Sequence, residues 1–381
     1  MPGNFNSHRE KPIYVSRAVP DINRTRIPVL DGFRGIAVLL VMCYHFVPAI
    51  FFGWAGVDLF FILSGFLITS ILMNTIGTRN YLSVYFSRRL LRIVPLFFLV
   101  LLFLFVLLPV FFPAWVTTAY KNLVDHQYWY WLFIANSSFA LNGFPENIIA
   151  VHFWSLACEM QFYLVWPVLI VLLHRRRNLL LIILLLLFFS AIFFRLFADE
   201  FFTMNNLFRY VLLPSRLDAF AAGGILYLYT TSGFTIRKNF MYFASVLVLL
   251  LIMILSWQGV NWHFTDPVVQ RYGLSLNVVF WLSVLALSLQ HPTGMLARVA
   301  GTGILRKAGT YSYGMYVLHL PVGIFIDKLL FPNAAGQENG MMLLLRVLLI
   351  FSVTIIISIA SFHLFEKKMM LLKPRYHVAD H

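Results

Sequence analysis

Long apolar segments recur along almost the whole chain and restrict its fold more than any other feature. They are long enough to cross the roughly 30 Å of hydrocarbon in a bilayer, and none shows the period-two alternation of a membrane β-barrel strand. Hydrophobic residues make up 60 % of the chain and charged residues 12 %, too few for a soluble surface. The sequence therefore predicts an all-α polytopic membrane protein with about ten transmembrane helices. The expected spans are 29–49, 54–76, 90–112, 150–173, 178–198, 208–230, 239–257, 271–290, 309–330 and 342–365.

The basic residues of the connecting loops predict the orientation of these spans. Most of them fall on one side when the spans are taken in alternation, and lysine and arginine mark the cytoplasmic side of a membrane protein. Both termini are therefore expected in the cytoplasm, with tails at 1–27 and 369–381 around a membrane domain at 28–368. The basic side includes Arg79, Arg88, Arg175, Arg298 and Lys367, whereas the other side includes Lys121, Arg195, Arg271 and Lys328.

The formal net charge of +14 does not indicate nucleic-acid binding, because the positive charges lie in short loops between apolar segments. Cys43 and Cys158 lie within apolar runs, so we expect no disulfide framework. We find no cysteine or histidine spacing typical of a metal site. Neither nucleic acid nor a metal ion is therefore an expected partner.

Ionisable residues inside the first two spans are the first functional candidates, because a charge in the membrane is expensive unless it is paired or hydrated. Arg34 and His45 lie eleven residues apart on one helix face, about 16 Å along the axis. Asp58 enters the second span at a similar depth and is expected to orient His45. The alternative is that Arg34 only extends its side chain to the membrane surface and that His45 is a hydrogen-bonded histidine of the core.

A basic cluster precedes the third span. Arg89 and Arg92 share a helix face next to Arg88, and guanidinium groups bind phosphate oxygens well. The cluster predicts a site for a phosphorylated cytosolic molecule, although membrane orientation alone also explains basic residues here. Gly56, Ser64 and Gly65 of the second span are expected only to permit close helix packing.

Later spans contain further ionisable and polar candidates. Glu159 falls near the middle of the membrane, and Arg216 is a candidate partner for either Glu159 or Asp218. In the ninth span His319 is as compatible with packing as with function. The aromatic loop 113–149 fits either an interfacial belt or a surface platform for a sugar or lipid acceptor. The remaining candidates in these spans are Trp154 and Tyr316.

Seven motifs in order resemble the type-3 acyltransferase family, membrane enzymes that O-acylate bacterial surface polysaccharides, lipopolysaccharide and some small molecules. The resemblance covers nearly the whole chain, from about 27 to 368. The motifs are Leu30–Ala37 with His45, Gly53–Phe66, Arg88–Pro95, Phe153–Pro167, Arg216–Asp218 with Gly223, Tyr311–His319 and Phe365–Lys367.

The resemblance implies an acyl-CoA donor, commonly acetyl-CoA, supplied from the cytoplasm across a bacterial cytoplasmic (inner) membrane. It also implies an essential histidine and arginine in the first span, matching His45 and Arg34, and a paired-arginine motif matching Arg89 and Arg92. Many relatives carry a fused SGNH-hydrolase-like domain after the membrane region. Since this chain ends at residue 381, we expect the stand-alone form.

We therefore predict transfer of an acyl group, acetyl by default, from acyl-CoA to a hydroxyl of a surface or lipid-linked saccharide, with no permanently bound cofactor. Direct attack with His45 as base and an acyl-histidine intermediate both remain open. A proton-coupled transporter or flippase, or a scaffold subunit for glycan assembly, is the alternative. The expected roles are catalysis for His45, Asp58 and Glu159, acyl-CoA binding for Arg34, Arg88, Arg89 and Arg92, and acceptor or channel contacts for Trp154, Arg216, Asp218, Tyr316 and His319.

Overall fold

The chain forms a bundle of long helices without strands in the residues that the computed structural model describes, 27–201, 205–233, 238–332 and 340–374. Of the predicted tails, residues 1–26 and 375–381 lie outside these residues. The long helices are α1 (Pro28–Phe46), α2 (Gly56–Thr75), α3 (Tyr81–Leu102), α8 (Phe153–Leu173), α9 (Arg177–Phe201), α11 (Leu217–Thr231), α12 (Lys238–Trp257), α13 (Leu274–Gln290), α15 (Gly303–Leu330) and α16 (Gly340–Ser361).

Short elements extend or connect the long helices. Three of them are π-helical turns, η2, η6 and η7, each continuous with a long helix. The short elements are η1 (Gly53–Ala55), η2 (Phe103–Leu107), α4 (Leu108–Phe111), η3 (Pro113–Trp115), α5 (Thr118–Asp125), α6 (Tyr128–Trp131), α7 (Ala135–Asn142), η4 (Ile148–Ala150), α10 (Phe208–Val211), η5 (Leu213–Arg216), η6 (Val269–Gly273), α14 (Met295–Ala300), η7 (Phe362–Glu366) and α17 (Lys367–Leu371).

Nine helices in the described residues are long and apolar enough to cross a membrane, and the prediction of an all-α polytopic membrane protein is confirmed. The tenth expected span, 208–230, is broken by η5, and α11 alone has 15 residues, about 22 Å. The segment from Arg209 to Thr231 nevertheless runs back along the whole of α9. Arg209 pairs with Asp199 at one end of α9, and Arg177 donates to Thr231 at the other.

Two pairs of helices approach each other at backbone distance and form the centre of the bundle. A methyl group added at Gly65 of α2 would overlap the Phe220 carbonyl of α11, and one added at Gly223 would overlap the Ile62 carbonyl. At Gly309 of α15 the obstacle would be the Asp31 carbonyl of α1. Small residues at such crossings are typical of membrane helices. They confirm the predicted packing role of Gly65.

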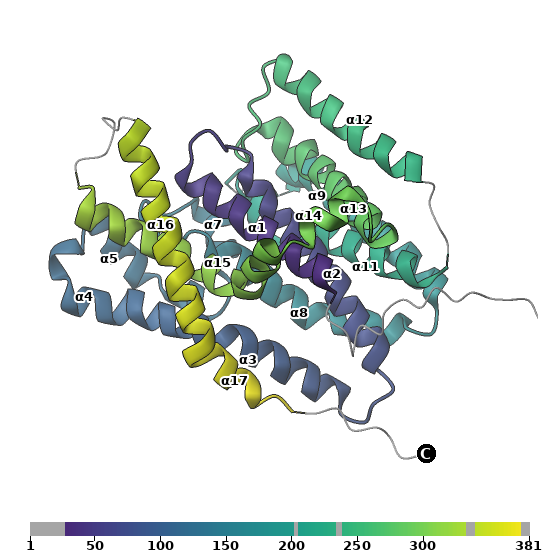
Figure 1. Cartoon of the computed structure of the whole chain (residues 1–381), viewed down its shortest axis with the longest axis horizontal. Helices are drawn as coiled ribbons and strands as arrows, with labels where there is room; N and C mark the ends of the chain where they lie inside the picture. Colours follow the sequence, from purple (N-terminus) through teal and green to yellow (C-terminus); the bar gives the residue numbers. More distant parts are fainter. Residues whose placement is uncertain (1–26, 202–204, 234–237, 333–339, 375–381) are drawn as a thin grey trace, which may run out of the picture.

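The remaining helices surround this centre. Figure 1 shows α12 at one edge of the molecule, separated from α1 and α2 by other helices. Most of α12 and α16 remains uncovered by the rest of the chain, as expected for helices that face lipid. The functional residues are therefore to be sought between α1, α2, α8 and α15.

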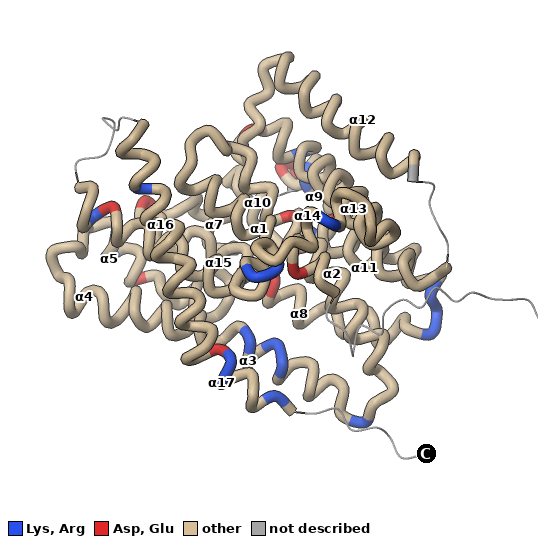
Figure 2. Tube along the Cα trace, viewed as in Figure 1, with Lys and Arg blue, Asp and Glu red and all other residues tan. Residues whose placement is uncertain are grey.

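The contacts between loops agree with the predicted alternation of sides. Lysine and arginine residues gather on α3 and on the neighbouring α17 (Figure 2), and Arg88 donates to the Pro374 carbonyl. At the opposite end, Tyr44 lies 2.9 Å from Nε2 of His263. These contacts pair segments that were assigned to the same side, while the cytoplasmic identity of the basic side stays a prediction.

The aromatic segment 113–149 serves mainly to cover the bundle. Tyr120 is buried and donates its hydroxyl to the Leu104 carbonyl, and the buried Tyr130 packs against Phe153. Tyr128, in contrast, is 48 % exposed. The predicted surface platform is therefore wrong for Tyr120 and Tyr130, because their rings pack inward.

Candidate functional site

A basic cavity of about 400 Å³ lies between α1, α3, α15 and the η7–α17 segment. Three arginines line it, and two carboxylates lie on its wall. Its size falls in the usual range of small-molecule sites, roughly 300–1,000 Å³. The ionisable and phenolic lining residues are Asp31, Arg34, Arg89, Arg92, Tyr313 and Glu366.

The three arginines after the second span lie within helix α3 and not in a loop. The helix begins at Tyr81 and not at 90 as expected, because a membrane helix can continue into the polar interface beyond the hydrocarbon. Arg89 and Arg92 line the cavity, as their shared helix face predicts. Arg88 instead bonds to the Pro374 carbonyl, which separates it from its two neighbours.

Two arginines of the cavity have nitrogen atoms that no group in the described part of the chain satisfies. Nε of Arg34 and Nε of Arg89 are buried without a hydrogen-bond acceptor. Buried donors of a charged group usually have partners, so these atoms indicate a site built for an added acceptor. The Arg89 guanidinium also lies over the Tyr163 ring, 5.9 Å from its centroid.

Glu159 lies beside this cavity and not near Arg216. Its carboxylate accepts hydrogen bonds from Ser64 of α2 and from the Tyr163 hydroxyl, the latter at 2.5 Å. Its charge acts on the Arg34 guanidinium. The candidate Glu159–Arg216 pair is therefore wrong, and Ser64 does more than permit close packing, because it donates to the Glu159 carboxylate.

Arg216 forms a fully buried ion pair with Asp58. Asn277 of α13 donates to the second Asp58 oxygen at 3.2 Å, and Arg216 lies over the Trp154 ring, 5.8 Å from its centroid. This corrects the prediction that Asp58 orients His45. Asp58 projects toward η5 and α13, where a guanidinium can compensate its charge inside the membrane.

A second buried pair joins Arg195 of α9 to Asp218 of α11 at 2.8 Å. Ser275 of α13 donates to the same carboxylate oxygen at 2.7 Å. The predicted Arg216–Asp218 pair is therefore wrong, and Arg195 is not a residue of the outer loop. The sequence signal was present, since an arginine between Phe194 and Leu196 in an apolar run requires a buried partner.

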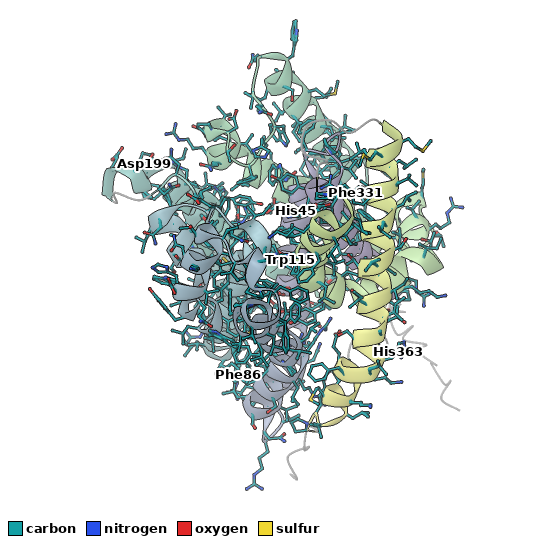
Figure 3. All side chains as sticks on the ribbon, turned by 90° about the vertical axis from the view of Figure 1, so that its left-hand side faces the viewer. His45, Phe86, Trp115, Asp199, Phe331 and His363 are labelled. Atoms are coloured by element: carbon teal, nitrogen blue, oxygen red, sulfur yellow. The ribbon has the colours of Figure 1, made fainter. Side chains whose placement is uncertain are left out.

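His45 lies near the end of α1 that is remote from the cavity. Figure 3 shows His45 among the helices in the interior and His363 lower in the view, on η7, the segment that helps to line the cavity. The His45 ring lies 5.1 Å from the ring of His319, and His319 lies 4.8 Å from His152, centroid to centroid. The structure thus brings together three histidines, from α1, from the N-cap of α8 and from α15.

One face of α8 connects the cavity to the three histidines. His152, Ser155, Glu159 and Tyr163 recur at helical spacing and are therefore on one side of the helix. The Tyr316 hydroxyl of α15 bonds to Ser155 and, at 2.9 Å, to the His152 carbonyl. We call these four residues and Tyr316 the polar column. It places polar groups along α8 between the arginines and the histidines.

Among the predicted site residues, the structure separates three groups. Arg34, Arg89, Arg92 and Glu159 surround or adjoin the cavity, and His45, Tyr316 and His319 lie at the far end of the polar column. The third group, Asp58, Trp154, Arg216 and Asp218, belongs to buried pairs or packs against them. Sequence reasoning did not assign functional positions to Asp31, Ser64, His152, Tyr163, Tyr313 and Glu366.

The sequence is similar to those of several curated proteins. The chain is 29 % identical over 369 residues to the "Putative peptidoglycan O-acetyltransferase YrhL" of Bacillus subtilis, covering 90 % of the chain and 54 % of that protein. It is 26 % identical over 371 residues to the "Peptidoglycan O-acetyltransferase OatA" of Listeria monocytogenes, with coverages of 90 % and 56 %. The chain thus spans about half the length of these curated relatives.

The "O-acetyltransferase OatA" of Staphylococcus aureus is 26 % identical over 318 residues, covering 79 % of the chain and 51 % of that protein. No solved structure shows significant similarity to the chain. A family profile described as "Acyltransferase domain" matches residues 27–363, which include the polar column, the three histidines and all of the cavity lining except Glu366 and Met370. The chain therefore belongs to this family of membrane acyltransferase domains.

Proposed function

We propose that this protein transfers an acetyl group from acetyl-CoA, bound at the cytoplasmic face, to a hydroxyl of a saccharide on the other side of a bacterial cytoplasmic membrane. One observation carries the proposal: a single helix, α1, joins a cavity rich in arginine at Arg34 to a histidine cluster at His45. The positive-inside rule favours both termini in the cytoplasm. The family match favours acyl transfer over the transporter alternative.

The cavity fits the phosphorylated end of the donor. Arg34, Arg89 and Arg92 offer guanidinium donors, of which the Nε atoms of Arg34 and Arg89 are unsatisfied. Phosphate oxygens are suitable acceptors because guanidinium groups bind them through charge-assisted hydrogen bonds. The pantetheine arm would then extend along the polar column, about 16 Å from Arg34 to His45. Glu159 partly balances the arginine charges when no donor is bound.

His45 is the proposed general base. It takes the proton of the acceptor hydroxyl, whose oxygen attacks the thioester carbonyl carbon. The carbon–sulfur bond then breaks, and the departing CoA thiolate receives that proton. An acyl-histidine intermediate remains the second route, in which His45 itself accepts the acetyl group before the hydroxyl does.

The proposed acceptor is peptidoglycan or its lipid-linked precursor, since two of the relatives are named for peptidoglycan. Lipopolysaccharide is the alternative saccharide. Tyr316 and His319 remain candidates for contact with the acceptor because they adjoin His45, whereas the buried pairs of Asp58 and Asp218 more simply hold the helices together. An assay with both saccharides distinguishes the two acceptors.

Replacing Arg89 and Arg92 together by glutamine tests the donor site. We expect the KM for acetyl-CoA to rise about 10²- to 10⁴-fold, because each of the two arginines loses a hydrogen bond to a charged group, worth roughly 1.5–3 kcal/mol, while kcat changes little. The measurement is transfer of labelled acetyl groups by membranes that contain the protein. The matched control is Arg298→Gln, an exposed arginine of α14 outside the cavity. An unchanged KM in the double variant would place the donor elsewhere.

The pH dependence of donor binding should depend on Lys373, which follows α17 and is half-buried. Burial and the charges of Arg92, Arg89 and Arg88 lower the pKa of Lys373 from 10.5 to about 8. Below pH 8 the ammonium form adds a positive charge beside the cavity, whereas the substrate phosphates stay ionised from neutral pH upward. We therefore expect the KM for acetyl-CoA to rise about fivefold between pH 7 and pH 9.

Lys373→Gln should remove this rise in the KM for acetyl-CoA, measured at a series of pH values from 6.5 to 9.5. Lys368→Gln is the matched control, because Lys368 is an exposed lysine of the same segment. This variant should keep the rise in KM. If the Lys373 variant retained the full pH dependence, another group would be responsible for it.

A further inference from the structure

We propose that His319 positions His45 for catalysis by accepting a hydrogen bond from its imidazole N–H, the task that the sequence assigned to Asp58. The inference rests on the proposed function, since it explains how the proposed base is oriented. It follows from three observations: the fixed tautomer of His319, the spacing of the two rings, and the engagement of Asp58 elsewhere.

The backbone fixes the tautomer of His319. Its Nδ1 lies 2.6 Å from the Tyr316 carbonyl, and a carbonyl can only accept, so Nδ1 carries the hydrogen. In the neutral ring, Nε2 is then an unprotonated acceptor. This Nε2 is buried without a partner, and the His319 residue has 0 % exposure. A buried acceptor without a donor is rare and indicates that a donor approaches it.

His45 is close enough to supply that donor. The centroids of His45 and His319 lie 5.1 Å apart with the ring planes tilted by 44°, a separation at which two imidazole nitrogens that are turned toward each other lie in hydrogen-bond range, about 2.8–3.0 Å. The other described ring contacts of His45 are aromatic, with Tyr44 and Phe46. A bond to His319 would leave the second nitrogen of His45 unprotonated and available to take a proton.

Neither a carboxylate nor a metal ion accounts for the cluster equally well. Asp58 is occupied by Arg216 and Asn277. Within the described ranges, no group of three or more histidine, cysteine, aspartate or glutamate residues has the arrangement of a metal site. His152 resembles His319, since its Nε2 donates to the Val317 carbonyl at 3.2 Å and its Nδ1 is unsatisfied. The described ring contacts join His152 to His319 and not to His45, and no hydrogen bond can join Nδ1 of His152 to Nε2 of His319, because both atoms are acceptors.

In the reaction, the bond from His45 to His319 persists while protons move at the opposite nitrogen. The acceptor hydroxyl gives its proton to that nitrogen, the new carbon–oxygen bond forms, and the carbon–sulfur bond breaks. The CoA sulfur then takes the proton, so His45 returns to its starting tautomer. His319 gains and loses no proton, and it is a positioning residue.

Two isosteric variants separate this role from a structural one. Asparagine at 319 keeps a donor near the place of Nδ1 and loses the acceptor at Nε2, whereas glutamine can place an amide oxygen near Nε2. We expect His319→Asn to lower kcat about 10- to 100-fold and His319→Gln to stay within about threefold of the wild type. Neither variant should change the KM for acetyl-CoA, because the donor cavity is remote. His126→Asn, at an exposed histidine, is the control.

Each outcome decides something. Equal losses in both variants, or full activity of His319→Asn, would overturn the positioning role while leaving His45 as base. Full activity of His45→Ala, or no transfer by the wild type with either saccharide, would overturn the proposed function and the positioning role with it. If His319→Asn does not fold, ¹⁵N-histidine spectra of the wild type decide instead. A coupling across an N–H···N bond that disappears in His45→Ala is expected, and its absence would overturn the inference.

Discussion

His45→Ala should reduce kcat for acetyl transfer by about 10²–10⁴, the usual contribution of a general base, without changing the KM for acetyl-CoA. The reason is geometric: the donor cavity is lined at the Arg34 end of α1, and His45 lies about 16 Å away along the helix axis. Labelled acetyl-CoA and membranes of wild type and variant provide the measurement. His126→Ala is the control, because His126 is an exposed histidine of the covering segment.

The pattern of constants also separates the two chemical routes. If the hydroxyl attacks directly, losing the general base lowers two rates together: acetyl transfer to the saccharide and the slow acetyl transfer to water. An acyl-histidine route predicts in addition that the wild type, denatured during turnover, carries label on the protein, and that His45→Ala carries none. A variant that retained wild-type kcat would remove His45 from the mechanism.

Arg216→Met should destabilise the protein by about 3–5 kcal/mol, because it leaves the buried carboxylate of Asp58 without a counter-charge. The double variant, Asp58→Asn with Arg216→Met, should recover most of this loss, since it removes both charges together. Stability is measured as the unfolding free energy of the detergent-solubilised protein in increasing dodecyl sulfate. Equal losses in the single and double variants would show that the pair does not act as a unit.

The matched control is the Arg346–Asp327 pair, which joins α16 to α15 at 2.6 Å with side chains 22 % and 30 % exposed. There, Arg346→Met should cost only about 0–1 kcal/mol. Burial, and not the presence of an ion pair, then accounts for the difference between the two sites. The Arg195–Asp218 pair, with side-chain exposures of 0 % and 2 %, should behave like Arg216–Asp58.

The helical architecture was predictable because apolar run length and the scarcity of charge specify membrane helices almost directly. The exception is 208–230, where a buried arginine and a short helical turn interrupt the pattern. The sequence predicts one span there, whereas the structure has two short helical elements and α11, which together run along α9 between the contacts of Arg209 and Thr231. The start of α3 was misjudged for a related reason, since hydropathy does not detect a helix that continues into the polar interface.

The pairing of charges was not predictable, because pairing depends on how each helix is rotated about its axis. A helix that is apolar on all sides, such as α2, gives no periodic signal for its rotation. Asp58 therefore appeared to share a depth with His45, while its side chain projects toward Arg216. Arg34 and His45, in contrast, are on one helix, where spacing alone fixes their common face.

The backbone contacts at Gly65, Gly223 and Gly309 also bear on how the proposed donor reaches His45. Separating helices that touch at their carbonyls would open a void, so these contacts favour a constant spacing of α2 from α11 and of α1 from α15. In the proposed reaction, the donor must then span the distance from Arg34 to His45 by its own length. The length of the pantetheine arm then decides whether the thioester reaches His45. A donor shortened by a few bonds is expected to bind among the arginines yet fail to present its acyl group to His45.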